Sequence, residues 1–326
     1  MANTVVVTGA SGFIGLPLCS LLVRSGADVR AAVRRHSTAL AALADLITDP
    51  STGGRLRQVV VGDLCTATDW SAALDGADAI VHLAARVHVA SGLADNERFR
   101  ELNIDATLRL AQAAARARVR RLVFVSSAKA GYGNEDGASD PYSRSKAEAE
   151  RLLGETSRHP GLECVIVRPQ LVYGPRVRAN FLRLMRLVDS GVPLPLASVA
   201  NRRSLLFVGN LADAICTCIG HPRAAGQAFA LSDGEDVSTP ELVRRIARAL
   251  GRPARLFPFP ARLLRLAGAI AGQIQSIDRL TGDLAIDSSP IRAALGWRPP
   301  FSMERGLAET AAWYRAHRGG AGRGRR

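Results

Sequence analysis

A tyrosine and a lysine four residues apart are the strongest candidates for chemistry in this sequence. Tyr142 and Lys146 lie in the segment Tyr-Ser-Arg-Ser-Lys, and residues at this spacing share one face of a helix. A phenol with a pKa of ~10 is a weak base at neutral pH, but a neighbouring ammonium group favours the phenolate and lowers that pKa. We therefore expect Tyr142 to act as an acid and base whose pKa is lowered by Lys146.

Two other polar residues are expected near this pair. Ser127 follows an apolar run and is placed to donate a hydrogen bond to the substrate oxygen that Tyr142 deprotonates. Asn103 opens a helical stretch and is a candidate for orienting Lys146 through a water. The chain has only four tyrosines, and only two of its 43 basic residues are lysines, Lys129 and Lys146. Chance therefore rarely produces the Tyr-x-x-x-Lys spacing in this composition.

A glycine-rich segment near the N-terminus predicts a dinucleotide site. It has the pattern G-x-x-G-x-x-G and lies between a β-branched run and a helical stretch. Glycine permits a tight turn and a close approach of backbone N–H groups to a pyrophosphate, which the positive end of the helix dipole also attracts. The residues expected to bind the pyrophosphate are Gly9, Ser11, Gly12, Phe13, Ile14 and Gly15.

The end of the second expected strand bears on the choice between NAD and NADP. An acidic residue there usually binds the ribose hydroxyls of NAD, whereas this sequence has Arg34 and Arg35 and no carboxylate. Arg34 would bind the 2′-phosphate of NADP or stack on the adenine. NADP is thus slightly favoured, while NAD stays open. Asp63, after the third expected strand, is placed to meet the adenine amino group.

The elements that must position these residues follow an alternating pattern. Apolar, β-branched runs alternate with helical stretches through the first half of the chain, as in buried parallel sheets. The pattern predicts an α/β fold with a doubly wound parallel Rossmann sheet. The expected strands are 5–8, 28–33, 58–62, 79–83, 122–126 and 164–168, and the clearest helices are 14–25, 107–118 and 143–155.

After Pro169, prolines interrupt short helical stretches, which predicts a smaller, mostly C-terminal substrate lobe. We expect an NAD(P)-binding Rossmann domain over 1–170, with a returning segment at about 204–232. The substrate lobe would then comprise 171–203 and 233–314. The Gly/Arg-rich end, 315–326, cannot build a core and is predicted to be a disordered basic tail.

Composition excludes several classes of protein. With 47% hydrophobic residues the chain is not disordered, and no stretch approaches the ~20 apolar residues of a membrane span. The N-terminus lacks a signal-peptide pattern. Five scattered cysteines predict a reducing cytoplasm without disulfides, and we expect no metal site. Five arginines of the tail contribute to the net charge of +14. We do not expect this tail to bind nucleic acid.

In combination, these motifs resemble those of the extended short-chain dehydrogenase/reductases, specifically the NAD-dependent epimerase/dehydratase family. The resemblance covers roughly residues 4–313. Besides the segments quoted above, the matching ones are 62–64, 82–85, 125–127, 168–175, 207–213, 287–289 and 295–297.

The resemblance implies roles for individual residues. Tyr142 would be the acid/base, Lys146 would lower its pKa and hold the nicotinamide ribose, and Ser127 would polarise the oxygen at C4 of a nucleoside-diphosphate sugar. Further cofactor contacts are implied for Leu64, Leu83, Ala84, Ala85 and Pro169.

The substrate diphosphate would need cations and amides, which the resemblance places at Asn180, Arg203 and Arg279. Because Arg202 precedes Arg203, which of the two reaches the diphosphate is open. A homodimer is also implied, since members of this family commonly pair through helices of the Rossmann domain.

Departures from the family pattern narrow the reaction. Sugar 4,6-dehydratases of the family follow the active-site threonine with an Asp-Glu pair, whereas this chain has Ser127, Ala128 and Lys129. We therefore exclude dehydration. The chain looks most like enzymes of surface-polysaccharide synthesis, either UDP-glucose 4-epimerases, which keep their NADH, or UDP-sugar 4-ketoreductases, which release oxidised cofactor.

Two alternatives to this assignment stay open. A reductase of a steroid- or flavonoid-like ketone would share the N-terminal motifs but would not need Asn180 or Arg203. A non-catalytic dinucleotide-binding regulator would be expected to have lost the pair of Tyr142 and Lys146, which this chain retains.

Overall fold

The computed structural model describes residues 3–47, 53–87, 97–131, 140–156, 161–260, 263–264 and 274–318. The chain divides into two units, each assembled from separate stretches. The first contains Met1–Gln170, Leu211–Leu231 and Ser288–Arg298, and the second contains Leu171–Asn210, Ser232–Asp287 and Pro299–Arg326. In the described part of the chain, no helix is both long and apolar enough to cross a membrane.

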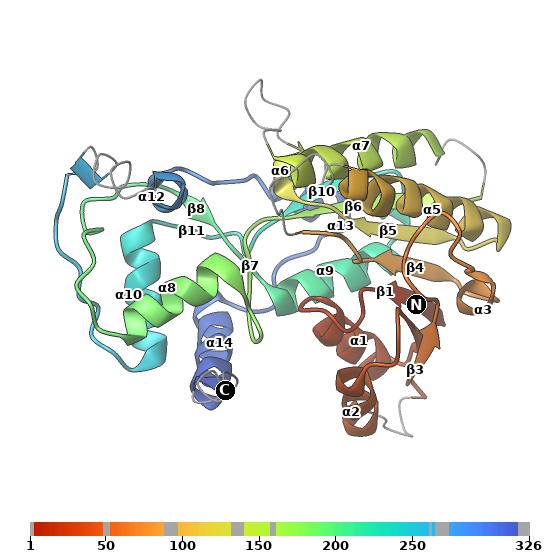
Figure 1. The fold of residues 1–326 in the computed structure, drawn as a ribbon, viewed down its shortest axis with the longest axis horizontal. Helices are drawn as coiled ribbons and strands as arrows, with labels where there is room; N and C mark the ends of the chain where they lie inside the picture. The colour runs from red at the N-terminus through yellow and green to blue at the C-terminus, as the bar shows by residue number, and fades with distance from the viewer. Residues whose placement is uncertain are drawn as a thin grey trace. The chain divides into compact units, whose positions relative to one another are not determined.

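A seven-stranded sheet forms the centre of the first unit, with the strand order β10-β6-β5-β4-β1-β2-β3 (Figure 1). Every neighbouring pair is parallel, so the predicted doubly wound fold is confirmed. The strands are β1 (Thr4–Thr8), β2 (Asp28–Val33), β3 (Arg55–Val60), β4 (Ala79–His82), β5 (Arg121–Val125), β6 (Glu163–Pro169) and β10 (Ala228–Leu231).

The third strand differs most from its prediction. It ends at Val60 rather than at 62, because its register pairs Val33 with Val60 and Gly62 then adopts a positive φ of 75°. β10 was not among the predicted strands. It pairs with β6 from Ala228 to Leu231, and it lies at the edge of the sheet.

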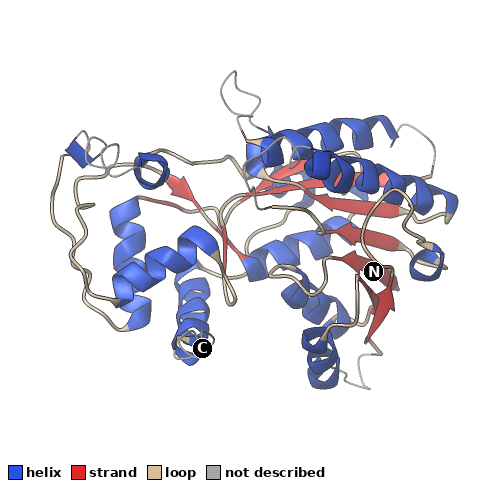
Figure 2. Cartoon of the chain, viewed as in Figure 1, coloured by secondary structure: helices blue, strands red, loops and turns tan. Residues whose placement is uncertain are grey.

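Helices cover both faces of this sheet, as Figure 2 shows. α5 (Ala106–Arg116) and α7 (Pro141–Thr156) lie on one face, and α1 (Gly15–Arg24), α2 (Thr38–Ile47) and α9 (Val208–Gly220) lie on the other. α5 buries Leu110, Ala111 and Ala114, which recur at helical spacing and pack into the main core. The shorter elements are α3 (Ser71–Leu74), η1 (Arg100–Asp105), α6 (Ala128–Gly131), η2 (Pro222–Ala224) and α13 (Ser289–Leu295).

The sheet order reverses between β1 and β4, which lie side by side with Thr8 opposite His82. In a doubly wound sheet, ligands bind at the carboxyl ends of the strands beside such a reversal. The glycine-rich segment follows β1, Leu83 follows β4 and Ser127 follows β5. The fold therefore places three predicted parts of the site together at the carboxyl ends of neighbouring strands.

The second unit contains two small sheets and several helices. β7 (Val172–Tyr173) pairs with β9 (Leu206–Phe207), and β8 (Arg203–Ser204) pairs with β11 (Asp236–Val237). Its helices are α8 (Ala179–Asp189), α10 (Thr239–Leu250), α12 (Ile274–Thr281) and α14 (Met303–His317).

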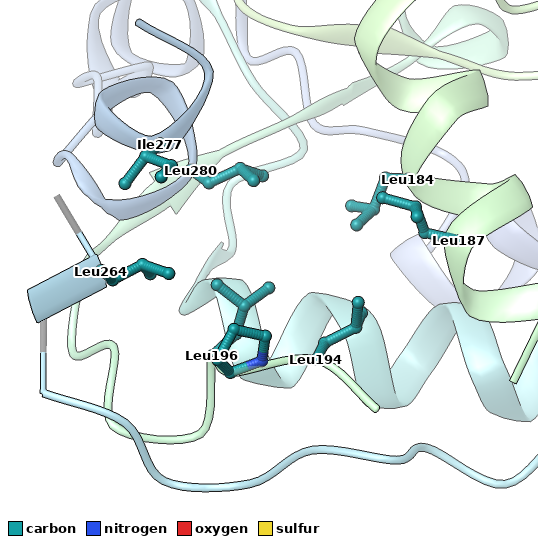
Figure 3. Close-up of a pocket in the computed structure, with 8 residues that line it drawn as sticks. Leu184, Leu187, Leu194, Leu196, Leu264, Ile277 and Leu280 are labelled. Atoms are coloured by element: carbon teal, nitrogen blue, oxygen red, sulfur yellow. The ribbon is translucent and has the colours of Figure 1, made fainter. Parts of the chain in front are cut away.

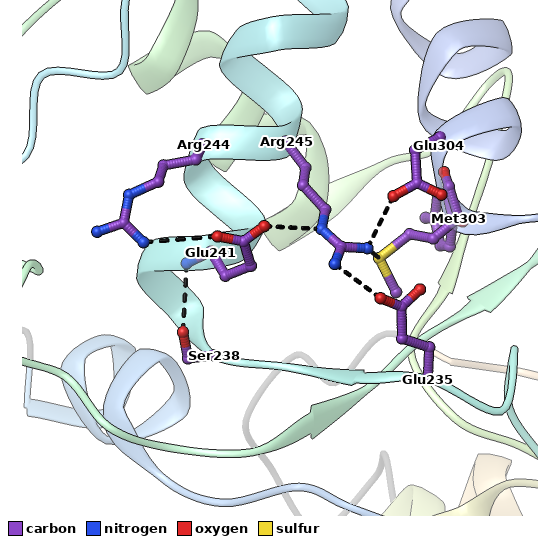
Figure 4. A network of polar contacts seen from close by, with 8 residues as sticks. Glu235, Ser238, Glu241, Arg244, Arg245, Met303 and Glu304 are labelled. Atoms are coloured by element: carbon purple, nitrogen blue, oxygen red, sulfur yellow. Dashed lines mark hydrogen bonds and ion pairs between the residues drawn. The ribbon is translucent and has the colours of Figure 1, made fainter.

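Arg245 joins three parts of this unit (Figure 4). Its guanidinium lies 2.7 Å from Glu235, before β11, 2.9 Å from Glu241 on its own helix α10, and 3.0 Å from Glu304 on α14. The Arg245 side chain is only 15% exposed. Ser238 accepts a hydrogen bond from the N–H of Glu241 and caps α10. These contacts fix α10 against α14.

Two predicted boundaries differ from the structure. Residues 288–298, predicted in the substrate lobe, belong to the first unit, because α13 packs against β10 and Trp297 donates to Asp213 over 2.7 Å. The predicted tail begins too early, since α14 continues to His317. Arg315 in this helix donates to the carbonyl of Ala249 over 2.8 Å. The remainder of the tail, 319–326, lies outside the described residues.

Candidate active site

The glycine-rich turn has the shape that a pyrophosphate site requires. Gly9 adopts a φ of 65°, and its carbonyl accepts a hydrogen bond from Gly12 over 3.0 Å. A Cβ on Gly9 would lie 2.9 Å from the backbone nitrogen of Ala84, and one on Gly15 would overlap the carbonyls of Gly9 and Ala10. The backbone thus leaves no room for side chains at these positions.

The start of α1 is open to a ligand. The N-cap position makes no side-chain hydrogen bond, so the first N–H groups of the helix are not capped by a side chain. Ser11 and Gly12 are exposed, and Phe13 and Ile14 are partly exposed. These residues fit the pyrophosphate of a dinucleotide.

Arg34 and Asp63, predicted to meet different parts of the adenosine, contact each other. Arg34 Nη1 lies 3.5 Å from Asp63 Oδ1, and both side chains are mainly exposed. A 2′-phosphate bound by Arg34 would therefore lie near the Asp63 carboxylate, which repels it. The structure gives no support to the predicted preference for NADP. Leu64, the next residue, is partly buried against the core.

The residues after β4 and at the end of β6 border the same edge of the sheet. The N–H groups of Leu83 and Ala84 each donate to Thr8 Oγ1 over 3.2 Å, and both residues are partly exposed, as is Ala85. Pro169 is the last residue of β6 and is also partly exposed.

Tyr142 and Lys146 lie one turn apart on α7. Asp140 accepts hydrogen bonds from the N–H and the hydroxyl of Ser143 and so caps this helix. Lys146 is 1% exposed. Its ammonium donates to the carbonyl of Val125 over 2.9 Å and lies 4.3 Å from the centre of the Phe124 ring. Burial lowers the pKa of Lys146 to about 7, while the Glu150 carboxylate opposes this effect.

The predicted lowering of the Tyr142 pKa relies on Lys146 together with a nicotinamide cation, and the groups of the protein alone do not produce it. Burial of the phenol, and then the negative charge of Asp140, raise the pKa of Tyr142 to about 12. The ammonium of Lys146 donates to Val125 instead of stabilising a phenolate. A working base at Tyr142 therefore requires an additional positive charge or a reoriented Lys146.

Asn103 contacts α7, the helix that carries Tyr142 and Lys146, directly. It lies in η1, a π-helical turn, and its amide donates a 2.9 Å hydrogen bond to Ser145 Oγ. Ser145 Oγ in turn donates a 2.8 Å hydrogen bond to the carbonyl of Tyr142. The same amide also donates to the carbonyl of Arg86, whose N–H donates to Asn103 Oδ1. Asn103 therefore positions α7 through Ser145, a residue not predicted, although it precedes Lys146 within the Tyr-x-x-x-Lys segment.

Ser127 lies between β5 and α6, and its side chain is partly exposed. Its hydroxyl accepts a long 3.4 Å hydrogen bond from the N–H of Lys129. The Lys129 ammonium lies 3.6 Å from Asp140, the residue that caps α7. Lys129 thus links the segment that carries Ser127 to the helix that carries Tyr142.

A buried chain of side chains, absent from the predicted site, joins the glycine-rich turn to η1. Thr8 Oγ1 lies 2.8 Å from His82 Nδ1, and His82 Nε2 lies 3.0 Å from Thr107 Oγ1. Thr107 donates 2.9 Å to the carbonyl of Asn103. All three side chains are at most 1% exposed. The sequence signal was the position of His82 in the family-like segment 82–85 and of Thr8 directly before the glycine-rich segment.

The predicted substrate residues lie in the second unit. Asn180, at the start of α8, is exposed. Arg203, in β8, is 8% exposed, and its Nη1 donates to the carbonyl of Gly282 over 3.5 Å. Burial lowers the pKa of Arg203. Arg202 is exposed and pairs with Asp236 over 2.7 Å. Arg279 belongs to α12, and its side chain lies outside the described residues.

The second unit also contains an apolar cavity of about 140 Å³ (Figure 3). The described residues around it carry no polar side chain, so this cavity does not suit a diphosphate. They are Leu184, Leu187, Leu194, Pro195, Leu196, Leu264, Ile277 and Leu280.

Asp233 is the centre of a polar cluster in the second unit. Its carboxylate accepts hydrogen bonds from the N–H of Phe207 at 2.8 Å, the amide of Asn210 at 2.7 Å and the hydroxyl of Tyr173 at 3.0 Å. Asn210 in turn exchanges two hydrogen bonds with the backbone of Phe301. Burial raises the pKa of Asp233 to about 6, and these hydrogen bonds limit the increase.

Comparison with known proteins gives consistent matches. The model of the NAD dependent epimerase/dehydratase family matches residues 5–232. UDP-glucose 4-epimerase of Vibrio cholerae is 40% identical to this chain and aligns with 95% of both sequences. A 3-beta-hydroxysteroid dehydrogenase of Mycolicibacterium neoaurum is 26% identical, over 95% of this chain and 91% of its own.

A solved structure with bound ligands has the same fold. MoeE5 in complex with UDP-glucose and NAD superimposes with a TM-score of 0.72 and is 27% identical. The match covers 96% of this chain and 99% of MoeE5.

Proposed function

Because the chain belongs to the NAD-dependent epimerase/dehydratase family, we propose that it is an NAD-dependent 4-epimerase of a UDP-sugar. The observation that carries this proposal is the 40% identity, over nearly the whole of both chains, to a UDP-glucose 4-epimerase. The steroid dehydrogenase relative is only 26% identical. The complex of MoeE5 with UDP-glucose and NAD further supports this pair of ligands.

Tyr142 is proposed to remove the proton of the sugar C4 hydroxyl and to return it at the end of the reaction. Ser127, partly exposed at the end of β5, donates a hydrogen bond to the same sugar oxygen. Asn103 and Ser145 hold the backbone at Tyr142 and so position the phenol. Lys146, together with the nicotinamide cation of bound NAD, would bring the Tyr142 pKa down from about 12.

The cofactor is proposed to be NAD. The glycine-rich turn and the uncapped start of α1 would hold its pyrophosphate. Lys146 would hold its nicotinamide ribose, and Asp63, beside Arg34, disfavours a 2′-phosphate. Leu64, Leu83, Ala84, Ala85 and Pro169 would border it. When bound, NAD supplies the oxidant for the C4 alcohol and the reductant for the resulting ketone.

The diphosphate of the sugar nucleotide is proposed to bind in the second unit. Arg203 is the better candidate of the two adjacent arginines, because Arg202 is already paired with Asp236. Arg203 Nη1 donates to the carbonyl of Gly282 over 3.5 Å. Asn180 and Arg279 complete this proposed subsite. We also propose a homodimer, as the family resemblance implies.

The test is turnover of UDP-glucose and related UDP-sugars by the purified protein, with the bound nicotinamide measured after desalting. An epimerase converts the sugar with no net change in NAD, and NAD stays bound. Oxidised cofactor released in proportion to product would instead identify a 4-ketoreductase. Conversion of a steroid ketone, with no turnover of any UDP-sugar, would overturn the proposal. Light scattering on the same sample measures the oligomeric state.

A further inference from the structure

The buried chain from Thr8 to Asn103 has only one consistent arrangement of its hydrogens. The Thr8 hydroxyl accepts hydrogen bonds from the N–H groups of Leu83 and Ala84, which occupy both of its lone pairs. Its single hydrogen is therefore available only for His82 Nδ1, 2.8 Å away. His82 Nδ1 must accept, so it carries no hydrogen.

The other imidazole nitrogen then has to be the donor. In a neutral imidazole one nitrogen donates when the other accepts, so His82 Nε2 carries the hydrogen and donates to Thr107 Oγ1 over 3.0 Å. The Thr107 hydroxyl donates its own hydrogen bond to the carbonyl of Asn103. Each donor in this chain has one acceptor. A second proton, on His82 Nδ1, would point at the hydrogen of the Thr8 hydroxyl and disrupt this series of hydrogen bonds.

The surroundings of His82 keep the imidazole neutral. Its ring stacks on Phe124 at 5.9 Å between ring centres, and Lys146 lies over the same phenyl ring. The groups that hydrogen-bond the ring from β1 and α5 are hydroxyls, and the charged group that acts on it is Lys146, from α7. Burial, followed by the Lys146 ammonium, lowers the pKa of His82 to about 3.

The chain connects the two halves of the proposed site. At one end, Thr8 immediately precedes Gly9 and holds the N–H groups of Leu83 and Ala84, against which Gly9 is packed. At the other end, Asn103 donates to Ser145, and Ser145 donates to the carbonyl of Tyr142. The contacts thus run without interruption from the dinucleotide turn to the helix of the proposed acid/base.

We propose that His82 is a positioning residue, fixed as the neutral imidazole with its hydrogen on Nε2, that sets the spacing between the dinucleotide turn and the Tyr142 helix. The catalytic consequence rests on the proposed function, whereas the tautomer and the effect on NAD binding do not. A protonated His82 would break this series of hydrogen bonds and place a second cation beside Lys146.

The tautomer is tested by nitrogen NMR of the ligand-free protein labelled with ¹⁵N-histidine. The chain has six histidines, and the signal lost in His82→Gln identifies His82. The expected spectrum shows an unprotonated Nδ1 and a protonated Nε2, both unchanged between pH 5 and pH 8. A hydrogen on Nδ1, or titration of this ring within that range, would overturn the proposal.

The positioning role is tested by two matched variants. In His82→Gln the amide retains one acceptor and one donor, whereas His82→Leu removes both and leaves Thr8 and Thr107 without their partner. We expect His82→Leu to weaken NAD binding by about tenfold and to lower kcat, because an unsatisfied buried polar group is costly. KM for the UDP-sugar should change little, and His82→Gln should restore most of the loss.

The outcomes separate this proposal from the proposed function. NAD affinity measured without sugar, together with the tautomer, tests His82 even if no UDP-sugar is turned over. If His82→Leu is folded and binds NAD as tightly as the unmodified chain, His82 has no positioning role, whatever the substrate. If His82→Leu does not fold, the proposal is supported by two results together. His82→Gln should keep the NAD affinity and kcat of the unmodified protein, and the NMR spectrum should show the expected tautomer. A folded His82→Gln variant whose NAD affinity and kcat fall as far as is expected for His82→Leu overturns the proposal.

Discussion

Arg168 binds both carboxylate oxygens of Glu150, with its Nε 3.1 Å from Oε1 and 3.0 Å from Oε2. Glu150 follows Lys146 by four residues on α7, as Lys146 follows Tyr142, so the three side chains share one face of the helix. Lys146 and Glu150 are both buried. The Glu150 carboxylate is the charge that opposes the effect of burial on the Lys146 ammonium.

Glu150→Gln should lower the pKa of Lys146 below its value of about 7. The substitution removes the negative charge but leaves Arg168 in place, so the decrease should be about one unit or more. The measurement is a pH titration of the lysine ¹³Cε signals. It is simple here because the chain has only two lysines, and the exposed Lys129 serves as an internal reference.

Glu148→Gln is the matched control for this change. Glu148 lies on the same helix but pairs with the exposed Arg151 over 2.8 Å. Its substitution should leave the Lys146 titration unchanged. An equal shift in both variants would show that Glu150 has no particular effect on Lys146.

Tyr142→Phe should lower kcat by a factor on the order of 10²–10⁴, the usual contribution of a general acid/base. In the ligand-free protein the Tyr142 phenol should stay protonated to above pH 10, because its pKa is about 12. Addition of NAD should lower this pKa, since the nicotinamide carries a positive charge. The difference in tyrosinate absorbance between the original chain and Tyr142→Phe, followed with pH, gives the pKa of Tyr142. It is recorded once without NAD and once with NAD.

Two results would contradict this account of Tyr142. Turnover by Tyr142→Phe at the original rate would exclude Tyr142 as the acid/base. A Tyr142 phenolate already present at neutral pH without NAD would show that Lys146 acts on it in the ligand-free protein.

Asp233 should make the second unit less stable as the pH rises. Its pKa is raised to about 6 from an ordinary 3.8, so the folded chain binds this proton more tightly than the unfolded chain does. The stabilisation is complete below pH 4 and is lost as the pH increases from about 4 to 6. The whole pKa difference corresponds to about 3 kcal/mol in the free energy of unfolding, of which about 2 kcal/mol is lost between pH 4 and neutral pH.

Asp233→Asn is the reference for this measurement, because the amide retains an oxygen that can accept from Phe207 and Asn210. Urea unfolding of both proteins at several pH values gives the difference in unfolding free energy. The original chain should gain about 2 kcal/mol relative to the variant between pH 7.5 and pH 4. A difference that is independent of pH would show that the Asp233 carboxyl is not perturbed.

Gly15→Ala should weaken NAD binding by about tenfold or more. A methyl group there would overlap the backbone carbonyls of Gly9 and Ala10, which cannot move without opening the turn. The control is Gly154→Ala on α7, where a Cβ meets no atom within 4 Å. That variant should keep its NAD affinity and gain about 0.5–1 kcal/mol of stability. Equal NAD affinity in both variants would exclude the turn as the pyrophosphate site.

Local sequence signals were sufficient for the parts of the molecule whose contacts are local. The spacing of Tyr142 and Lys146 follows from helix geometry, and the glycine pattern follows from backbone conformation. Continuous apolar runs located most strands of the sheet, because parallel strands are buried on both faces. The end of β3 could not be located in this way, since its register depends on pairing with β2.

Tertiary contacts account for what the sequence did not predict. The direction of the Lys146 ammonium depends on the Val125 carbonyl in β5, and the contact of Asn103 depends on Ser145 in α7. The pairing of Arg34 with Asp63 joins residues 29 positions apart. Spacing along the chain carries no information on which of several nearby partners a long side chain will choose.

The cluster around Asp233 also has a consequence for biosynthesis. The second unit draws on three separate stretches of chain. Asp233, in the middle stretch, holds Phe207 and Asn210 from the first, and Asn210 binds Phe301 from the last. On the ribosome, where chains emerge N-terminus first, this cluster cannot close until Phe301 has left the exit tunnel. Completion of this cluster is therefore tied to the emergence of residue 301, and in a shorter nascent chain Asn210 lacks its hydrogen bonds to the Phe301 backbone.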